Sequence, residues 1–358
     1  DQVRYAENRL KFETFKKEFP QYKNEVITQP IIIMGLPRSG TTHLLNLIAS
    51  DTRLKSIPYW ESLRPFPENL NNSNHDKDLR QETAFKEYDN FLQTMPLLKS
   101  MHDMHPNHIH EEIELQAMDF STYLPEWLAY VPEWRDYYLK NEQIHHYKYL
   151  KDILKAMQFI KGPKRWVLKS PQHLEQINPL RKTFPDATFV ITYRDPLSVV
   201  LSTATMLSYG DRLRRYKVEP KTNFNYWHNR IKILLQRFTK DYEAIPLKQR
   251  CDVFFNDLIK DNLGSIKNIY SKNFLALNNL ARDEMQEYIA LNKRDKHGQV
   301  IYNLEDFEVD KSEFYKSFEF YFKNWILVSF MIMNGVFFVL LFITIGKFLM
   351  SIRTVSNS

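Results

Sequence analysis

The stretch "GLPRSGTT", residues 35–42, has the residue types and spacing of a phosphate-binding loop. It follows an apolar run and opens a helical pattern, and the backbone N–H groups at such a turn attract anions. Against the pattern G-x-x-x-x-G-K-[ST], both glycines and the final hydroxyl match, but Thr41 replaces the lysine and the cation comes earlier, at Arg38. A nucleoside triphosphate hydrolase needs that lysine and an acid for magnesium at a strand end, for which Asp195 and Asp257 are weak candidates. The loop therefore predicts anion binding without triphosphate hydrolysis, with an ordinary strand-to-helix corner as the alternative.

A histidine-rich stretch, "HDMHPNHIHEE" at residues 102–112, is the second candidate for chemistry. Four histidines and two glutamates crowd together here, and such side chains could hold zinc. Their spacing is irregular, Pro106 interrupts it and the sequence supplies no fixed partner elsewhere. We therefore expect no metal and a polar loop at the entrance of a substrate site. The sole cysteine, Cys251, excludes an intrachain disulfide and is expected to be an inert core thiol in the apolar run "CDVFF".

Two further segments contain charged or polar residues at the ends of expected strands. "RWVLKSPQHL" (165–174) is a strand pattern that ends in a lysine, and "FPDATFVITYRDPLSVVLS" (184–202) has an arginine at a strand end with a serine eight residues later. Together with the loop, these segments resemble sulfotransferases that use 3′-phosphoadenosine 5′-phosphosulfate (PAPS), in particular the branch that includes tyrosylprotein sulfotransferases and many bacterial sulfotransferases. Weaker similarity at 253–261 and 296–307 extends the resemblance over residues 28–322.

The resemblance implies a role for each residue that matches a family motif. Sulfuryl transfer needs positioned cations near the leaving phosphate and one base for the acceptor hydroxyl, and it demands no metal. Lys169 would stabilise the bridging oxygen as the sulfuryl group departs, with a solvated strand-end lysine as the alternative. The resemblance assigns the donor's 3′-phosphate to Arg194 and Ser202, and its 5′-phosphosulfate to Arg38, to the backbone of Ser39, Gly40, Thr41 and Thr42, and to the two threonine hydroxyls.

Glu61, in "PYWESLRPFP", is the expected general base. It lies close to where tyrosylprotein sulfotransferases place their catalytic glutamate, and Trp60 with nearby prolines would exclude water and raise its basicity. A surface glutamate is the alternative. Cytosolic small-molecule sulfotransferases use a histidine instead, so His110 and Glu112 are rival bases. The aromatic run at residues 123–138 is expected either to pack helices together or to form a wall of the acceptor site.

Apolar runs alternate with helical patterns along the chain. Strands are expected at 31–34, 165–168, 188–192 and 252–255, and helices at 42–49, 80–99, 110–123, 134–160, 172–183, 196–207, 222–243, 257–272 and 279–291. This alternation predicts an α/β fold with a mostly parallel sheet covered on both faces. The resemblance implies a three-layer α/β/α fold of the P-loop NTPase type. A helical insertion at 60–160 is expected over the sheet's carboxyl edge, where open α/β sheets bind their substrates.

The C-terminal run "WILVSFMIMNGVFFVLLFITIG", residues 325–346, contains no charged residue. A helix of 22 residues would span roughly 33 Å, which is enough to cross the core of a bilayer. We therefore expect a sulfotransferase domain at 1–323 and a membrane anchor with a short tail at 324–358. The protein would then be a single-pass membrane protein whose catalytic domain faces either the cytoplasm or the Golgi lumen.

Composition limits the classes of partner. Lys and Arg number 49 against 43 Asp and Glu, a net charge of +6 over 358 residues. Without a concentrated basic stripe, this excess favours an anionic small molecule or a membrane surface over nucleic acid. The sequence thus predicts a PAPS-dependent sulfotransferase that acts on a hydroxylated lipid, glycan, protein or small molecule, with a homodimer left open. A P-loop kinase and a non-catalytic, membrane-tethered nucleotide-binding module are the alternative functions.

Overall fold

Five parallel strands form the central sheet of the computed structural model, which describes residues 1–68, 78–293, 298, 300 and 304–325. The strand order is β2-β5-β1-β6-β7, and every pairing between neighbours is parallel. The strands are β1 (Ile31–Gly35), β2 (Leu54–Lys55), β5 (Arg165–Lys169), β6 (Thr188–Tyr193) and β7 (Arg250–Phe254). The four longer strands lie at the four expected apolar runs, so the mostly parallel α/β sheet is confirmed.

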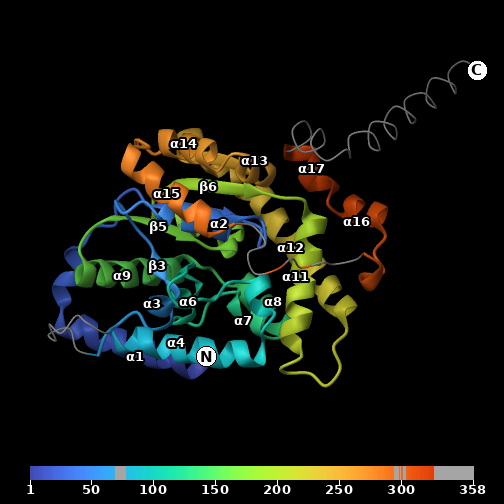
Figure 1. Ribbon diagram of the computed structural model, residues 1–358, viewed down its shortest axis with the longest axis horizontal. Coiled ribbons are helices and arrows are strands. Elements are labelled where there is room, and N and C mark those ends of the chain that lie inside the picture. Colours follow the sequence, from blue (N-terminus) through green and yellow to red (C-terminus); the bar gives the residue numbers. More distant parts are fainter. Residues whose placement is uncertain (69–77, 294–297, 299, 301–303, 326–358) are drawn as a thin grey trace, which may run out of the picture. The chain divides into compact units, whose positions relative to one another are not determined.

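Helices cover both faces of this sheet (Figure 1). One layer contains α2 (Thr41–Ala49), α13 (Phe255–Lys260), α14 (Asn262–Lys272) and α15 (Asn279–Leu291). Ile31 and Ile33 of β1 face this layer and join one buried cluster with Leu44 of α2, Ile269 of α14 and Met285 of α15. The other layer contains α9 (Ile144–Lys161), which contacts α10 (Ile177–Thr183), which in turn contacts α12 (Pro220–Asp241). Because both faces are buried there, β1, β5 and β6 are almost continuously buried, whereas the edge strand β7 alternates and exposes Asp252.

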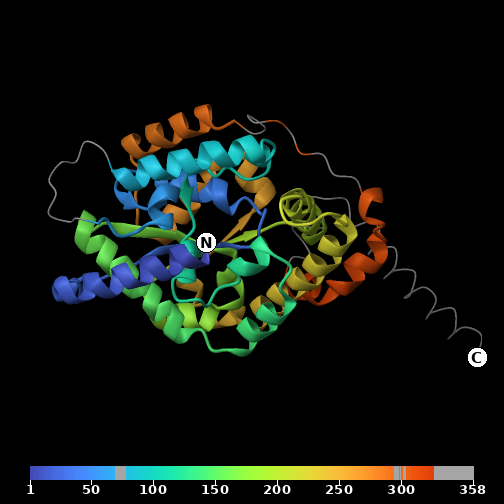
Figure 2. The same cartoon turned by 90° about the horizontal axis from the view of Figure 1, so that it is seen from below.

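The segment between β1 and β5 contains most of the remaining helices. They are α3 (Tyr59–Leu63), α4 (Leu79–Thr94), α5 (Leu98–Met101), α6 (Ile113–Ala117), α7 (Leu124–Leu128) and α8 (Pro132–Lys140). Two short strands, β3 (Ile57–Pro58) and β4 (Ile109–His110), pair antiparallel within this segment. Figures 1 and 2 show α1 (Gln2–Glu18) beside these helices, and the Asn8 side chain of α1 donates a hydrogen bond to the carbonyl of Leu63 at 2.8 Å.

The chain continues after β6 with α11 (Pro196–Asp211), which packs against α12. The short 3₁₀ helices are η1 (Pro20–Asn24), η2 (Pro171–Glu175), η3 (Tyr242–Ala244), η4 (Leu247–Gln249) and η5 (Glu305–Phe307). Contacts divide the chain into two compact units, Asp1–Glu308 and Val309–Ser358, and α16 (Lys311–Ser317) and α17 (Glu319–Trp325) belong to the second. The domain division expected after residue 323 stays a prediction.

Five of the expected helices are interrupted or shortened. The pattern at 110–123 forms only α6, because His110 belongs to β4 and Phe120 has a positive φ of 51° that a helix does not allow. The pattern at 172–183 divides into η2 and α10.

In the segment 80–99, α4 ends before Pro96 and α5 begins after it, because proline supplies no backbone N–H and clashes with the preceding turn. The pattern at 257–272 divides at Asp261, whose side chain accepts a hydrogen bond from the N–H of Gly264 and so caps the start of α14. The pattern at 134–160 divides into α8 and α9.

The expectation of a C-terminal transmembrane helix is corrected. Among the described residues, no helix is both long enough and apolar enough to cross a membrane. The 22-residue α12 is long enough but carries charged side chains such as Arg230 and Lys240, and α17 has 7 residues where about 20 are needed. Beyond Trp325, the expected anchor at 325–346 lies outside the described residues. The fold is therefore stated without a membrane-spanning helix, and the localisation as a single-pass anchored protein is not supported.

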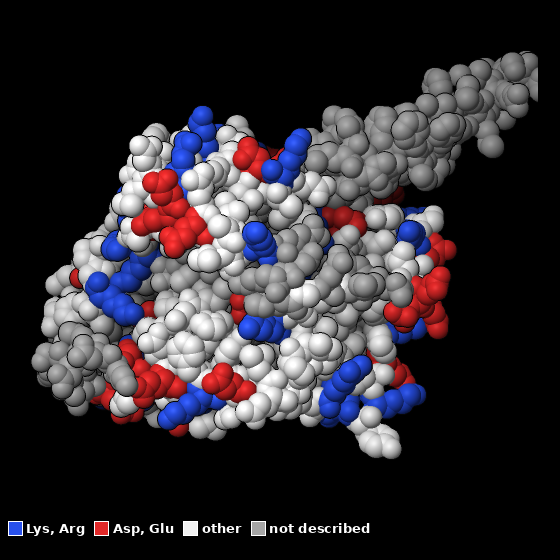
Figure 3. All heavy atoms as spheres, viewed as in Figure 1, with Lys and Arg blue, Asp and Glu red and all other residues white. Residues whose placement is uncertain are grey.

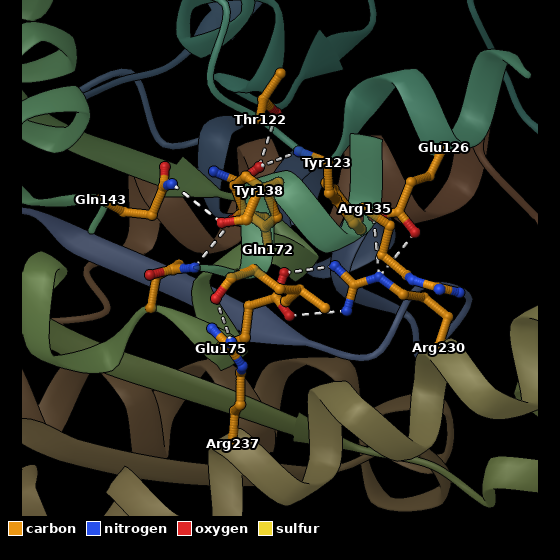
Figure 4. A network of polar contacts seen from close by, with 12 residues as sticks. Thr122, Tyr123, Glu126, Arg135, Tyr138, Gln143, Gln172, Glu175, Arg230 and Arg237 are labelled. Carbon is orange, nitrogen blue, oxygen red and sulfur yellow. Dashed lines mark hydrogen bonds and ion pairs between the residues drawn. The ribbon is translucent and has the colours of Figure 1, made fainter. Parts of the chain in front are cut away.

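A fully buried arginine joins three segments of the fold (Figure 4). Arg230 of α12 is 0% exposed, and its Nε donates to the carboxylate of Glu126 on α7 at 2.9 and 3.0 Å. Its two terminal nitrogens donate to Glu175 at the end of η2 at 2.8 and 2.6 Å. The hydroxyl of Tyr226 is a second donor to Glu126, at 2.7 Å. The guanidinium therefore links α7 and the segment that follows β5 to α12.

We expect Arg230→Met to lower the free energy of unfolding by about 3–5 kcal/mol, because two buried carboxylates would lose their shared cation. Chemical denaturation of the folded protein measures this loss. The matched control is Lys240→Met on the exposed side of the same helix, which should change stability by about 0.5 kcal/mol or less. Equal losses for the two variants would contradict a structural role for the buried cluster.

Candidate active site

The carboxyl ends of four parallel strands meet at one cavity of about 950 Å³. β1 leads into the glycine-rich loop, β5 ends at Lys169, β6 is followed by Arg194 and β7 by Phe255. These loop and strand-end residues line the cavity together with side chains from α1, α4, α7 and α11. The structure thus brings the expected loop, lysine and arginine to one edge of the sheet, where ligands bind in open α/β folds.

Both glycines of the loop are required by its geometry. A Cβ on Gly35 would lie 1.9 Å from Oγ1 of Thr192 on the neighbouring strand, a distance at which backbone and side chain would have to move. Gly40 has φ of 85°, and a Cβ there would lie 2.9 Å from the ring of Phe255. Arg38 also adopts a positive φ, of 64°, which non-glycine residues rarely do. This backbone turns the chain sharply into α2.

The N-terminus of α2 supplies the backbone donors of the loop. Ser39 is fully buried, and its hydroxyl contacts both the carbonyl of Leu36 and the hydroxyl of Thr192, so its side chain points into the fold. Its N–H also donates to the carbonyl of Leu36, at 3.2 Å. The first N–H groups of an α-helix have no partner within the helix, which leaves those of Gly40, Thr41 and Thr42 available to an anion.

Arg194, after β6, contacts Arg38 of the loop. Nε of Arg38 donates to the hydroxyl of Ser202 on α11 at 3.0 Å, and Arg194 donates to the backbone carbonyl of Arg38. The guanidinium of Arg194 also stacks over the ring of Phe255, 4.3 Å from its centroid. Arg194 and Ser202 thus each contact Arg38, but only Arg194 is among the residues that line the cavity, and the assignment of both to the 3′-phosphate stays a prediction. The side chain of Arg38 lies toward Ser202, whereas the resemblance assigned Arg38 to the 5′-phosphosulfate.

Lys169 forms a buried ion pair with Glu111. Its Nζ lies 3.3 Å from Oε1 of Glu111, and the two side chains are 4% and 13% exposed. Both residues line the cavity, and Oε2 of Glu111 has no hydrogen-bond partner among the described residues. Burial raises the pKa of Glu111, and the charge of Lys169 opposes this rise only in part. The Glu111 carboxyl is therefore a stronger base than an ordinary glutamate and faces the cavity next to a cation.

Glu112 points away from Glu111, into the fold. Its Oε2 accepts a hydrogen bond from the N–H of Lys169 at 2.8 Å, and its Oε1 lies 2.5 Å from Nε2 of His173. Nδ1 of His173 lies 2.8 Å from the hydroxyl of Tyr147. Burial alone would raise the pKa of Glu112, but His173 and the backbone N–H groups hold it below its ordinary value. Glu112 therefore stays ionised and fixes the backbone of Lys169.

The structure places Glu61 apart from these residues. Glu61 is 3% exposed, and its Oε1 lies 2.7 Å from Nζ of Lys161 at the end of α9. It is not among the side chains that line the cavity, although its neighbours Tyr59 and Leu63 are. Its assignment as the general base stays a prediction, which this geometry does not favour.

The four histidines of the 102–112 stretch divide into two pairs. His102 and His110 line the cavity with ring centroids 5.9 Å apart, whereas His105 packs against Phe85 and Tyr88, and the carbonyl of His108 accepts from Tyr59. Burial lowers the pKa of His102 to about 3, and burial together with His102 lowers the pKa of His110 far below its ordinary value. Both rings are therefore neutral at pH 7. In the part of the chain that the structure describes, no group of three side chains could hold a metal ion.

Sequence patterns alone did not single out Glu111 as a candidate base. The feature that could have identified Glu111 is its position beside Glu112, directly after the short strand β4. In this strand His110 pairs with Ile57 of β3. That pairing orients two adjacent glutamates oppositely, one to the cavity and one to His173. From the aromatic run at 123–138, Trp127 packs on Trp227 with centroids 4.2 Å apart, and Tyr123 and Trp127 line the cavity. That this part of the lining binds the acceptor stays a prediction.

The comparisons with known proteins agree with this site. Over residues 30–277 the chain matches a model of the sulfotransferase family. Its structure is similar to that of sulfotransferase STF1 from Mycobacterium tuberculosis H37Rv, with a TM-score of 0.74 and 24% identity over 86% of this chain and 80% of that chain. It is also similar to that of sulfotransferase STF9 from Mycobacterium avium, with a TM-score of 0.78 and 20% identity over 91% and 84%. No curated protein sequence matches the chain.

The two structural similarities show a shared fold, and the family match covers most of the chain, including the loop, Lys169, Arg194 and Ser202. It disfavours the kinase and the non-catalytic module as functions. This chain belongs to the sulfotransferase family and is a sulfotransferase.

Proposed function

We propose that this sulfotransferase takes its sulfuryl group from PAPS and transfers it to a hydroxyl of an acceptor bound in the same cavity. The family implies PAPS as the co-substrate. The observation that carries the proposal is the convergence, on one cavity, of an anion-binding loop, a pair of arginines and a buried Lys169–Glu111 pair. The structure offers one site with two kinds of wall: a cationic one at the sheet edge and a largely apolar one beyond it.

The donor end fits a molecule with two separate phosphate groups. The N–H groups of Gly40, Thr41 and Thr42 would hold the 5′-phosphosulfate at the start of α2, where the helix dipole adds to the attraction. Arg194 and Ser202 would hold the 3′-phosphate, Arg194 as a forked donor pre-oriented by Phe255. Arg38, which contacts Ser202, would add a second cation between the two groups.

Transfer breaks the bond between sulfur and the 5′-phosphate oxygen and forms a bond between sulfur and the acceptor oxygen. Lys169 would stabilise the negative charge on the departing phosphate oxygen. Glu111 would accept the proton of the acceptor hydroxyl, which gives a sulfate ester, adenosine 3′,5′-bisphosphate and a protonated carboxyl. The ion pair of Lys169 with Glu111 would hold the two side chains next to each other until the substrates separate them.

Glu111 is preferred to the three bases expected from the sequence. Glu61 pairs with Lys161 away from the cavity lining, and both oxygens of Glu112 are engaged inside the fold. His110 lines the cavity, but burial lowers its pKa and so weakens it as a proton acceptor. Glu111 combines access to the cavity with a raised pKa.

We expect Arg194→Ala and Lys169→Ala to affect different steps. Loss of Arg194 should weaken binding of adenosine 3′,5′-bisphosphate by about 10- to 100-fold, as expected for a charge-assisted hydrogen bond. Loss of Lys169 should lower kcat by about 100-fold or more and leave that affinity close to wild type. Isothermal calorimetry without magnesium and transfer of radiolabelled sulfate at saturating donor measure the two quantities. Equal effects of the two substitutions on both quantities would contradict this division of roles.

We expect Glu111→Gln to lower kcat by about 100-fold or more, because the amide cannot accept the acceptor's proton. Glu61→Gln is the matched control, a buried glutamate paired with a lysine outside the cavity lining, and it should keep most of its turnover. His110→Ala should also retain turnover. The assignment is wrong if Glu61→Gln loses more activity than Glu111→Gln while both variants bind the bisphosphate normally.

The pH dependence of kcat should follow the same carboxyl. Because the pKa of Glu111 is raised by burial, the base is lost as pH falls through a value above that of an ordinary glutamate. Lys169 lowers the pKa of Glu111, so Lys169→Met should move the acid limb of its residual activity to higher pH. A shift to lower pH in that variant, measured from pH–rate profiles, would exclude Glu111 as the titrating base.

A further inference from the structure

We infer that the acceptor is an apolar small molecule that carries its reacting hydroxyl at one end, such as an alkyl-substituted phenol or a polycyclic alcohol. The inference rests on the proposed function, because the Lys169–Glu111 pair defines where the hydroxyl lies. Gly210 would set the width of the part of the cavity that holds the body of this acceptor.

The wall of the cavity changes character beyond the Lys169–Glu111 pair. Six apolar side chains from three helices line it: Tyr88 and Phe91 of α4, Leu124 and Trp127 of α7, and Met206 and Leu207 of α11. Each sugar hydroxyl buried against such walls without a partner would cost about 1–3 kcal/mol. An apolar body gains about 25 cal/mol for each Å² removed from water. The lining therefore selects against a polyhydroxylated acceptor and for an apolar one.

Several of the charged side chains that line the cavity are paired with one another, whereas the Tyr88 hydroxyl is buried with no hydrogen-bond partner among the described residues and is the one polar group of this wall that could meet an acceptor. Glu114 accepts hydrogen bonds from Arg4 at 2.9 Å and from the Tyr5 hydroxyl at 3.0 Å. These opposite charges compensate each other within the protein, so a charged acceptor gains no counter-ion from them. His102 and His110 are neutral at pH 7 and offer no cation to an acidic acceptor.

A peptide acceptor fits this wall less well than a small molecule. Each residue of an extended peptide brings one N–H and one carbonyl group that need hydrogen-bond partners when buried. Much of this wall is made of side chains from the two 16-residue helices α4 and α11, whose interior backbone groups are paired within the helix and so offer no partner to a peptide. A compact apolar body with a single hydroxyl makes no such demand.

Gly210 is a gap in the α11 part of this wall. It lines the cavity in the last turn of the helix, four residues after Met206 and three after Leu207, so the three residues lie on one face. A Cβ added to Gly210 would meet no heavy atom within 4 Å. A side chain at this position would therefore enter open space of the cavity without displacing the fold, which makes Gly210 a determinant of acceptor size.

The experiment measures kcat/KM with radiolabelled PAPS for four acceptors: phenol, a bulky apolar alcohol such as a sterol, a monosaccharide, and a tyrosine-containing peptide. We expect the sterol-like alcohol to be used best among them. In the series wild type, Gly210→Ala, Gly210→Phe, the ratio of kcat/KM for the bulky alcohol to that for phenol should fall stepwise, by about tenfold or more at phenylalanine.

The matched control is Asn90→Phe, which adds the same ring to an exposed neutral position of α4 that does not line the cavity, and it should keep the wild-type ratio. Calorimetric binding of adenosine 3′,5′-bisphosphate to each variant shows that the donor end is folded. Gly210→Leu replaces Gly210→Phe if the larger residue does not fold.

Two sets of outcomes separate this inference from the function on which it rests. The acceptor class is overturned if the bisphosphate binds but the monosaccharide or the peptide is the better acceptor, if no apolar alcohol accepts sulfate, or if the Gly210 series leaves the ratio unchanged. The proposed function itself fails if the bisphosphate does not bind and sulfate is transferred from PAPS to none of the four acceptors.

Discussion

The close approach of Gly35 to Thr192 is the contact on which the site depends. Gly35 of β1 pairs with Thr192 of β6, and Ile33 of β1 pairs with Lys169 of β5, so one register sets the position of all three strand ends. A side chain at Gly35 would collide with Thr192. Because the strands are parallel, this register places the loop, the lysine and the arginine after β6 at a single edge. The anion-binding geometry therefore follows from strand pairing, and the loop completes it.

Buried charge then holds the strand ends in position. Around Lys169, Glu112 faces inward, accepts a hydrogen bond from the N–H of Lys169 and is held by His173, while Glu111 faces the cavity and pairs with the ammonium. Behind them, Arg230 ties the segment after β5 to the helix that forms part of the acceptor wall. On the face drawn in Figure 3, by contrast, basic and acidic side chains are interspersed. The buried charges of Lys169, Glu111 and Glu112 lie at the carboxyl end of β5, and those of Arg230 and its two glutamates support the segment that follows it.

The sequence predicted those parts of the fold that depend on local pattern. β1, β5 and β6 were clear because their apolar runs are almost completely buried. Arg194 and Ser202 were assigned through the resemblance of their segment to a family motif, and this assignment stays a prediction. Helix α1 was missed, because Asn8 interrupts its buried stripe of Tyr5, Phe12 and Phe15 and donates to a distant carbonyl instead. The preference for Glu111 over Glu61 depends on the pairing of β3 with β4 and on Lys161 of α9, contacts between segments far apart in the chain. The transmembrane expectation rested on hydropathy alone, and no described helix supports it.

A crystal structure of the protein with adenosine 3′,5′-bisphosphate is the most direct test of the account. We expect the 5′-phosphate on the N–H groups of Gly40, Thr41 and Thr42, within reach of Lys169, and the 3′-phosphate between Arg194 and Ser202. The apolar end of the cavity, beyond Glu111, should stay free for the acceptor. A nucleotide bound with its two phosphates exchanged, or seated among the side chains of α4 and α7, would contradict the arrangement proposed for donor and acceptor.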